Sequence, residues 1–539
     1  MDQAGKQEQV MKKIEIYDTT LRDGAQGEGI SFSSVGKIRV AKILDELGVD
    51  YIEGGYAASN PKDMEFFHAI KRERLQHARI AAFGSTRRAG IKAADDAGSR
   101  ALIEADTPVV TIFGKSWAFH VHEVLRTTED ENRAMIFDTV RFLKENGREV
   151  IYDAEHFFDG YKDSPAHALA TLRAAKSAGA DRIVLCDTNG GTPYFEVGDI
   201  TRDVISQIGG NVGIHTHNDS ELGVANSLEA IRAGAMHVQG TINGFGERCG
   251  NANLCSIIPN LGLKMGYSVL SSPEKMGQLK TVADFVYEMA NVRPNDKAAF
   301  VGHSAFAHKA GMHVDGVNKN PHSFEHITPE SVGNQRRVLI SELSGTSNVF
   351  LKAVEMGLSL DKKSPEVKNI LKELEVMEKK GYEFEAAEAS FKLLIQKVLK
   401  AHKPFFSLEG FRVIVEKRHA EEPCISEATV KLRINGDVLH TVGEGDGPVD
   451  ALNDAMRKAL SAAYPSIKDV HLVDYRVRIL DPEEATAAKT RVLIESSDGD
   501  KTWGTVGVST NLIEASWEAL VDSVEYKLFL DEQKRSGKA

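Results

Sequence analysis

Residues Val212-Gly213-Ile214-His215-Thr216-His217-Asn218-Asp219 join a short apolar run directly to a group of polar side chains. The apolar part is typical of a buried parallel strand. Side chains alternate across a strand, so His215 and His217 point the same way. Two imidazoles on one face can bind one divalent ion. An isolated pair of this kind more often consists of two surface or core histidines, so the rest of the chain decides between the two interpretations.

Seven further segments have the same strand-like pattern, and stretches with a helical hydrophobic period separate them. The clearest of these stretches end at a glycine that can stop a helix; they are Ser34–Leu47, Asn132–Glu145, Ala166–Ala178 and Ala225–Ala233, with Gly48, Gly147, Gly179 and Gly234. The eight predicted strands are Ile14–Tyr17, Asp50–Gly54, Arg79–Phe83, Val109–Phe113, Glu149–Ala154, Arg182–Cys186, Val212–His215 and His237–Thr241. Eight such units in about 280 residues predict a TIM (β/α)8 barrel, with a doubly wound sheet as the alternative.

A TIM barrel carries its functional residues just after the carboxyl ends of its strands. The residues of this chain that can do chemistry follow six of the predicted strands in this way. They are Asp18-Thr19-Thr20-Leu21-Arg22-Asp23-Gly24, Glu53, Glu155-His156, Asp187-Thr188-Asn189-Gly190-Gly191, the histidine pair, and Asn243-Gly244 with the loop Gly250-Asn251-Ala252-Asn253. We therefore expect a single site at the mouth of the barrel.

The histidine pair needs a further ligand, and Asp23 is the best carboxylate because it leaves the first strand at the same rim. Two histidines and one carboxylate leave open positions for water or substrate. The amide oxygen of Asn251 is a fourth, weaker candidate, and Asp219 is expected to support a ligand rather than to bind. Ligands without a thiolate favour Mg²⁺ or Mn²⁺, while Zn²⁺, Co²⁺ and Fe²⁺ stay open.

Two other residues suit a small acid bound beside such an ion. Arg22 supplies a fixed positive charge that can stabilise an oxyanion next to a polarised carbonyl, unless it only forms a structural ion pair. Thr188 offers a hydroxyl group, and Gly190-Gly191 lets the backbone approach a carboxylate closely. Together they predict an α-keto acid chelated through its keto and carboxylate oxygens.

Length and composition limit the class of protein. A chain of 539 residues is expected to hold two or three domains. Its 42% hydrophobic and 27% charged residues indicate a soluble globular protein, and the net charge of -12 argues against nucleic-acid and anionic-membrane partners. Residues 1–12 are polar and are expected to form a disordered leader without a signal sequence. The four cysteines lack CxxC spacing, which argues against disulfides and suits the cytoplasm.

The C-terminal part contains an internal repeat. Phe411-Arg412-Val413 matches Tyr475-Arg476-Val477, and Thr441-Val442-Gly443 matches Thr505-Val506-Gly507, both at an offset of 64 residues. Each copy reads as strands, a glycine-containing turn and an amphipathic helix, which predicts a pair of βββα-type units in an α+β domain. Turns that lead into helix N-termini favour a ligand with a carboxylate, although a purely structural dimerisation module is the alternative. Ser364–Lys400 is predicted to be a helical connector.

Three segments resemble the signatures of the α-isopropylmalate, homocitrate and citramalate synthase family, whose members condense acetyl-CoA with an α-keto acid. They are Tyr17–Gly24, His215–Asp219 and Gly246-Glu247-Arg248-Cys249-Gly250-Asn251-Ala252. Within that family, Gly29-Ile30-Ser31-Phe32, Tyr51–Tyr56 and Ser59–Asp63 are most similar to the bacterial citramalate synthases. Ala25 stands where many relatives have Glu, which weakens an assignment to the isopropylmalate branch.

The resemblance implies roles for individual residues. Asp23, His215, His217 and Asn251 would bind the metal, Arg22 would polarise the reacting carbonyl, and Thr188 would hold the keto-acid carboxylate. Glu155 resembles the acidic residue that the family places near the thioester methyl group. His313 with Asp315 resembles the family's Gly-x-His-x-Asp motif and is the candidate base. A hinge histidine that only forms hydrogen bonds is the alternative, and His303 and His308 are expected to be structural.

The resemblance also implies an overall function and a division into domains. The chain would be an acyltransferase that makes (R)-citramalate from acetyl-CoA and pyruvate in isoleucine biosynthesis. It would work as a homodimer and respond to isoleucine or leucine. The expected domains are a catalytic barrel (13–290), a linker and lid (291–404) and a regulatory domain (405–535). A larger keto acid, giving 2-isopropylmalate or homocitrate, is the first alternative; a carbon–carbon lyase and a non-catalytic amino-acid sensor are further ones.

Overall fold

The computed structural model describes residues 11–58, 61–309, 311–339, 364–480 and 488–535, so most of the predicted disordered leader lies outside the described residues. The chain divides into two compact units, which are described separately. The first comprises Met1–Phe306 and Glu325–Arg336, and the second comprises Ala307–Phe324 and Arg337–Ala539.

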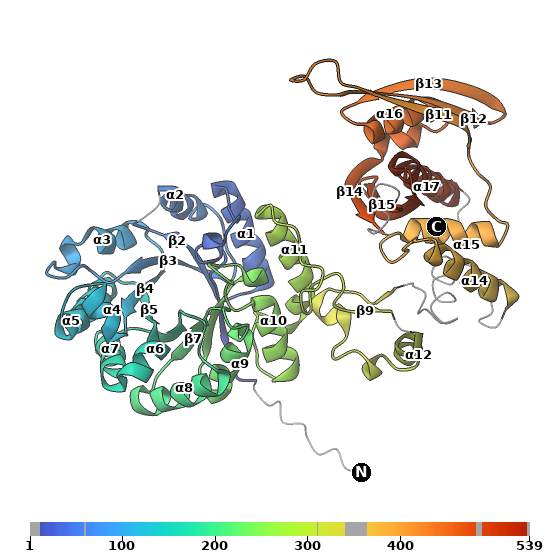
Figure 1. The fold of residues 1–539 in the computed structure, drawn as a ribbon. Coiled ribbons are helices and arrows are strands. Elements are labelled where there is room, and N and C mark those ends of the chain that lie inside the picture. Colours follow the sequence, from blue (N-terminus) through green and yellow to red (C-terminus); the bar gives the residue numbers. More distant parts are fainter. Residues whose placement is uncertain (1–10, 59–60, 310, 340–363, 481–487, 536–539) are drawn as a thin grey trace, which may run out of the picture. The chain divides into compact units, whose positions relative to one another are not determined.

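Eight parallel strands form a closed barrel in the first unit (Figure 1), which confirms the predicted TIM barrel. Closure comes from the pairing of the first strand with the last, in which Glu15 lies opposite His237. The strands are β1 Glu15–Asp18, β2 Tyr51–Tyr56, β3 Arg79–Ser85, β4 Val109–Lys115, β5 Glu149–Glu155, β6 Arg182–Asp187, β7 Val212–Thr216 and β8 His237–Gly240.

Helices surround this barrel, and their ends follow from local sequence. The glycines predicted to stop four of them all have a positive φ, which confirms those ends. Three starts differ from the prediction: α7 begins at Pro165 rather than Ala166, and α9 at Gly223 rather than Ala225. The largest difference is in α5, which begins at Glu129 rather than Asn132, because the Thr128 side chain accepts the backbone N–H of Glu131 and caps the helix. The helices are α1 Ser34–Leu47, α2 Pro61–Ile70, α3 Ala97–Glu104, α4 Ala118–Glu123, α5 Glu129–Glu145, α6 Phe157–Asp163, α7 Pro165–Ser177, α8 Tyr194–Ile208, α9 Gly223–Ala233, α10 Leu254–Pro259 and α11 Leu279–Met289.

The alternation of side chains along the strands separates two apolar layers. Residues such as Ile16 and Ile214 pack outward with the helices in the main core. Their neighbours along the strands form a second, smaller cluster that includes Tyr17, Ile151 and Val184. His215 follows Ile214 and therefore belongs to the inward-pointing set, as the sequence predicts.

The second unit contains the predicted repeat: two three-stranded antiparallel sheets, each followed by a helix. Both copies carry a register shift at equivalent places, between Leu408 and Gly410 and between Leu472 and Asp474. Buried residues of both copies form one shared core. The elements are β9 Ala307–His308, α12 Gly311–Lys319, β10 Arg337–Val338, α14 Pro365–Lys379, α15 Glu388–Val398, β11 Ser407–Glu416, β12 Ile425–Ile434, β13 Asp437–Gly445, α16 Pro448–Leu460, β14 His471–Ile479, β15 Thr490–Ser497, β16 Thr502–Ser509 and α17 Leu512–Arg535.

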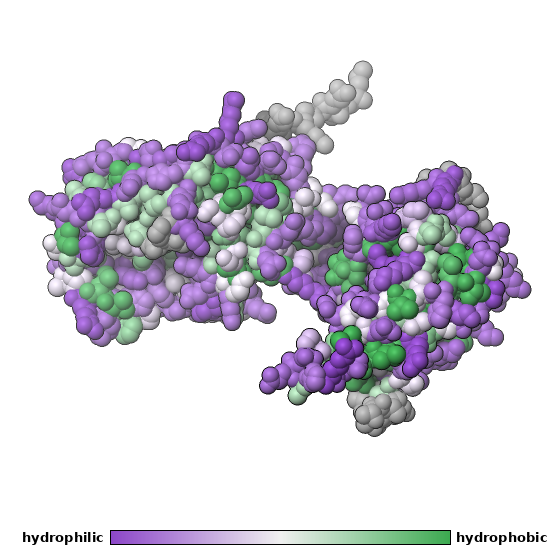
Figure 2. All heavy atoms as spheres, turned by 90° about the horizontal axis from the view of Figure 1, so that it is seen from above, coloured by the Kyte–Doolittle hydropathy of each residue, from purple (hydrophilic) through white to green (hydrophobic). Residues whose placement is uncertain are grey.

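Hydrophobic side chains also reach the surface of this unit, where Figure 2 shows green patches among hydrophilic residues. On β11 and β14 they include Val415, Val477 and Ile479, which are 53%, 46% and 56% exposed. None of the described helices is long and apolar enough to cross a membrane.

Candidate active site

The turn after β1 places Arg22 and Asp23 at the carboxyl end of the barrel. The Asp18 carboxylate accepts the backbone N–H and the hydroxyl of Thr20, at 2.9 and 2.8 Å. The Thr20 hydroxyl in turn accepts the backbone N–H of Ile242, which follows β8. This chain of bonds ties the turn to the neighbouring loop and fixes the direction of the two residues that follow it.

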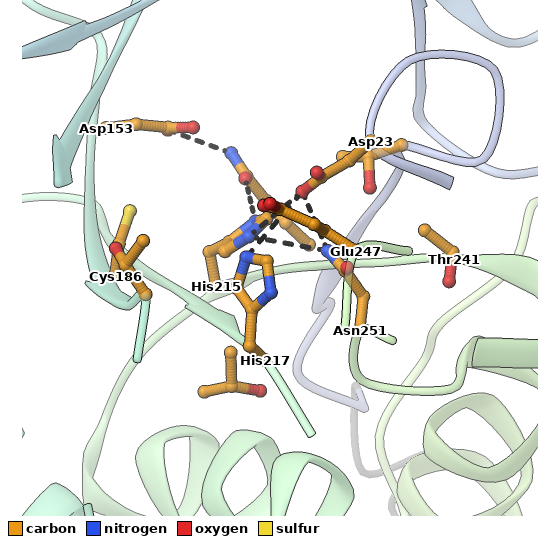
Figure 3. Close-up of polar contacts among 12 residues, drawn as sticks. Asp23, Asp153, Cys186, His215, His217, Thr241, Glu247 and Asn251 are labelled. Atoms are coloured by element: carbon orange, nitrogen blue, oxygen red, sulfur yellow. Dashed lines mark hydrogen bonds and ion pairs between the residues drawn. The ribbon is translucent and has the colours of Figure 1, made fainter. Parts of the chain in front are cut away.

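Asp23, His215 and His217 converge at the mouth of the barrel (Figure 3). The Asp23 Oδ2 atom lies 3.3 Å from Nε2 of His215 and 4.0 Å from Nε2 of His217. One potential ligand atom from each residue lies within 4.8 Å of the others, and all three residues are buried. The structure therefore brings the three strongest predicted ligands together.

The protonation states of His217 and Asp23 suit metal binding, whereas burial acts to lower the pKa of His215 but the Asp23 carboxylate outweighs it and raises that pKa above its ordinary value. Burial, reinforced by the neighbouring His215, lowers the pKa of His217 to about 4, so its imidazole is neutral at pH 7. Burial acts to raise the pKa of Asp23, but Arg22 and the two histidines outweigh it and hold that pKa well below its usual range. A neutral imidazole and an ionised carboxylate both offer lone pairs.

Asn251 joins this group because the loop after β8 forms a bridge with the loop after β7, in which Asn251 pairs with His217. Its Nδ2 atom donates to Asp23 Oδ2 at 2.8 Å, and its buried Oδ1 atom has no hydrogen-bond partner. Gly246, with a φ of 156°, makes room for the amide, since a Cβ atom there would lie 2.0 Å from Oδ1. The unpartnered oxygen and the shared carboxylate fit a site that an ion completes.

A buried clamp holds Arg22. Its Nε atom donates to Glu53 at 2.5 Å, its Nη1 atom lies 3.3 Å from Asp23, and its guanidinium stacks 3.8 Å from the centre of the Phe83 ring. Glu53 is fully buried and also accepts from the Tyr17 hydroxyl at 2.6 Å. Burial acts to lower the pKa of Arg22, but the two carboxylates raise it above its ordinary value, so the side chain is a permanent cation.

Thr188 and Glu155 lie on adjacent parts of the rim. The Thr188 hydroxyl oxygen accepts the backbone N–H of His156 at 2.9 Å, which leaves its own proton available for a ligand. His156 has a φ of 54°, in the left-handed region. Glu155 forms an ion pair with Lys115 at the end of β4.

Asp219, which the sequence predicts to support a metal ligand, forms an ion pair with Arg248 at 2.7 Å.

Two cavities border the mouth. One, of about 270 Å³, is lined by Arg22, Lys37 and Tyr56 among others. The other, of about 430 Å³, lies between the ends of β3 and β4 and is lined by Phe113 and Lys115 among others. They offer space for ligands on the side of the barrel where Arg22 and Glu155 lie.

His313 and Asp315 lie on α12, in the second unit. The exposed His313 ring stacks on Phe324, with 4.4 Å between ring centres, and Asp315 pairs with Lys319 at 2.7 Å. Their role as a catalytic base stays a prediction.

Sequence reasoning did not identify Glu53 as the clamp on Arg22, nor Asp153, Gln239 and Lys115 as neighbours of the site. Each is a polar residue within an apolar strand. A polar side chain at an inward-pointing strand position is the signal that would have drawn attention to them.

Comparisons with known proteins agree with this architecture. Residues 13–286 match the HMGL-like family, residues 300–381 the homocitrate synthase post-HMGL domain-like family, and residues 385–528 the LeuA allosteric (dimerisation) domain. The chain is 54% identical over 528 residues to an (R)-citramalate synthase of Geobacter sulfurreducens, covering 98% of this chain and 100% of that protein. It is 52% identical over 524 residues to an (R)-citramalate synthase of Aquifex aeolicus, covering 97% and 99%.

A 2-isopropylmalate synthase of Pyrococcus furiosus is 31% identical over 521 residues, covering 95% of this chain and 99% of that protein. The chain belongs to the HMGL-like family. Its resemblance to the α-isopropylmalate, homocitrate and citramalate synthases is confirmed over nearly its whole length.

Proposed function

We infer that this chain condenses acetyl-CoA with pyruvate to give (R)-citramalate and free CoA. The observation that carries this conclusion is its high identity, over the full chain, to relatives named for this activity. Identity to the relative named for the 2-isopropylmalate reaction is much lower. In the reaction, the acetyl methyl carbon loses a proton and bonds to the keto carbon of pyruvate; water then cleaves the thioester and CoA leaves as a thiol.

We propose that Asp23, His215 and His217 bind a divalent ion, with Asn251 as a fourth ligand after a half-turn of its amide. The amide nitrogen now faces Asp23, and Oδ1, which has no partner, would take its place. Mg²⁺ or Mn²⁺ suits this set of oxygen and nitrogen donors, and Zn²⁺ or Co²⁺ is the alternative. When bound, such an ion supplies Lewis-acid polarisation of the keto group.

We propose that Arg22 and Thr188 position pyruvate. Arg22 cannot move away from the site because Glu53, Asp23 and Phe83 hold it on three sides. Its remaining N–H groups can donate to the oxygen that gains negative charge as the new carbon–carbon bond forms. The free proton of Thr188 can donate to the carboxylate of the keto acid.

We propose that Glu155 acts near the thioester methyl group and that His313, with Asp315, takes up the proton. Glu155 forms an ion pair with Lys115, and Lys115 lines the second cavity. A base must be close to the methyl group and unprotonated, and the same base can activate the water that hydrolyses the thioester. A His313→Gln variant that retains full turnover would refute this assignment.

The second unit supports a regulatory proposal. Its match to the LeuA allosteric (dimerisation) domain and its exposed apolar strands support a homodimer with an isoleucine site in residues 405–535. We keep the division into a barrel (13–290), a linker (291–404) and this domain as part of the proposal. We also propose that the protein works in the cytoplasm and takes part in isoleucine biosynthesis.

One assay tests these points together: release of the CoA thiol from acetyl-CoA with pyruvate, 2-oxoisovalerate or 2-oxoglutarate as acceptor. Pyruvate should give rapid release that stops with EDTA and returns with Mn²⁺ or Mg²⁺. Release with 2-oxoisovalerate but not with pyruvate would refute the citramalate assignment, and turnover in EDTA would refute the metal site. Isoleucine should inhibit more strongly than leucine; no effect of either would favour a structural role for the repeat.

A further inference from the structure

Three buried side chains from three different strands form one hydrogen-bonded chain behind the proposed metal site. Gln239 of β8 donates through Nε2 to Asp153 Oδ1 of β5 at 3.0 Å, and its Oε1 atom lies 2.9 Å from Nδ1 of His215 on β7. The exposed fractions are 0% for Gln239, 4% for Asp153 and 5% for His215. Figure 3 labels Asp153 and His215, the two ends of this chain of bonds.

When Asp153 is ionised, the hydrogen bonds from Asp153 through Gln239 to His215 can run in only one direction. An ionised carboxylate only accepts, so Asp153 bonds the NH₂ end of the Gln239 amide. The oxygen end then faces His215, and because that oxygen also only accepts, the proton of the imidazole must lie on Nδ1. In the reverse orientation the amide oxygen would face Asp153, which would place two acceptors together without a proton in a buried site.

The position of this proton decides which nitrogen atom of His215 can bind a metal ion. With its proton on Nδ1, His215 carries its lone pair on Nε2, the atom that lies 3.3 Å from Asp23 Oδ2. His217 differs, because its buried Nδ1 atom has no hydrogen-bond partner. The structure thus fixes the tautomer of His215 through Gln239 on the neighbouring strand and through the Asp153 carboxylate, which is 86 positions from Gln239 in the sequence.

We propose that Gln239 and Asp153 are positioning residues that hold His215 in its metal-binding tautomer and so raise the affinity of the site for its divalent ion. The proposal rests on the metal site described under the proposed function. Partners that orient a ligating histidine are expected to change metal affinity by about 10- to 100-fold when they are removed.

Calorimetric titration of the full-length, EDTA-treated protein with Mn²⁺ tests this directly, without relying on activity. We would use pH 8, because burial raises the pKa of Asp153 to about 7 and the carboxylate is then ionised. Gln239→Leu removes the acceptor for Nδ1 and should weaken Mn²⁺ binding about 10- to 100-fold. Asp153→Asn keeps the volume but lets the amide turn around, and should weaken binding by roughly 3- to 30-fold.

Cys186→Ala is the matched control. Cys186 lies on β6 directly opposite His215 in the barrel, and it is equally buried, but its thiol takes no part in this chain of bonds. The Cys186→Ala variant should bind Mn²⁺ within about twofold of the parent, and an equal loss there would overturn the proposal.

The isosteric Asp153→Asn variant decides the case if Gln239→Leu fails to fold. Parent-like affinity in Asp153→Asn would mean that the carboxylate does not set the tautomer, and the proposal would be wrong. Failure of the parent protein to bind any Mn²⁺ would refute the metal site itself. Tight binding by the parent and by both variants would refute this inference alone.

Discussion

Glu53→Gln should lower kcat/KM for the condensation about tenfold because it weakens the clamp on Arg22. Glu53 is fully buried, and its two oxygens accept from Arg22 Nε at 2.5 Å and from the Tyr17 hydroxyl at 2.6 Å. Glutamine keeps this shape if its oxygen faces Arg22 and its NH₂ group faces Tyr17, whose hydroxyl can then donate to Thr111, 2.6 Å away.

The Glu53→Gln variant therefore keeps the hydrogen bonds to Arg22 and Tyr17 but loses the negative charge beside Arg22. Exchanging a charge-assisted bond for a neutral one costs about 1–2 kcal/mol. If that free energy is lost from the transition state, kcat/KM falls roughly tenfold, since 1.36 kcal/mol corresponds to a factor of ten. Glu53→Leu leaves Arg22 with Asp23 as its remaining carboxylate and should cost about 3 kcal/mol, or roughly 100-fold.

The assay is CoA-thiol release at saturating acetyl-CoA and Mn²⁺, with pyruvate varied, together with thermal denaturation of each variant. Glu15→Gln is the matched control, because Glu15 accepts from Arg182 at 2.6 and 2.7 Å at the opposite end of β1. It should lower stability to a similar extent but leave kcat/KM within about twofold. The reasoning is wrong if Glu53→Gln retains parent activity or if Glu15→Gln loses as much.

Three further predictions concern other parts of the chain. His217→Ala should reduce Mn²⁺-dependent CoA release by about 100-fold or more while the metal-free protein melts like the parent, because the Nδ1 atom of His217 has no protein partner; undiminished turnover would contradict the site. Asp45→Ala should lower the free energy of unfolding by about 3 kcal/mol in urea titrations, because this carboxylate accepts three backbone N–H groups, those of residues 76–78, at 2.8, 2.8 and 2.7 Å; kcat should not change. Burial raises the pKa of Glu525 to about 7, so its ionisation destabilises the fold as pH rises from about 4.5 through 7. Glu525→Gln should therefore raise the melting temperature by roughly 3 °C at pH 8 and not at pH 4, and an equal gain at both pH values would disprove this cause.

Much of the architecture could be predicted because it depends on local patterns. Strand and helix periods, with a glycine after four of the predicted helices, were enough to count the units of the barrel and to say which end carries polar residues. The alternation of side chains gave the inward direction of His215, and the repeat at 64 residues gave the paired sheets of the second unit. The positions of Arg22 and Asp23 followed from their place just after β1.

What the sequence could not give is which residues meet across the barrel. The partner of Arg22 is Glu53 on the next strand, the partner of Glu155 is Lys115, and the amide of Gln239 bridges Asp153 and His215. These contacts depend on strand register and barrel closure, which bring together residues tens of positions apart. A local pattern fixes the face on which a side chain lies, whereas only the closed sheet fixes what stands opposite it.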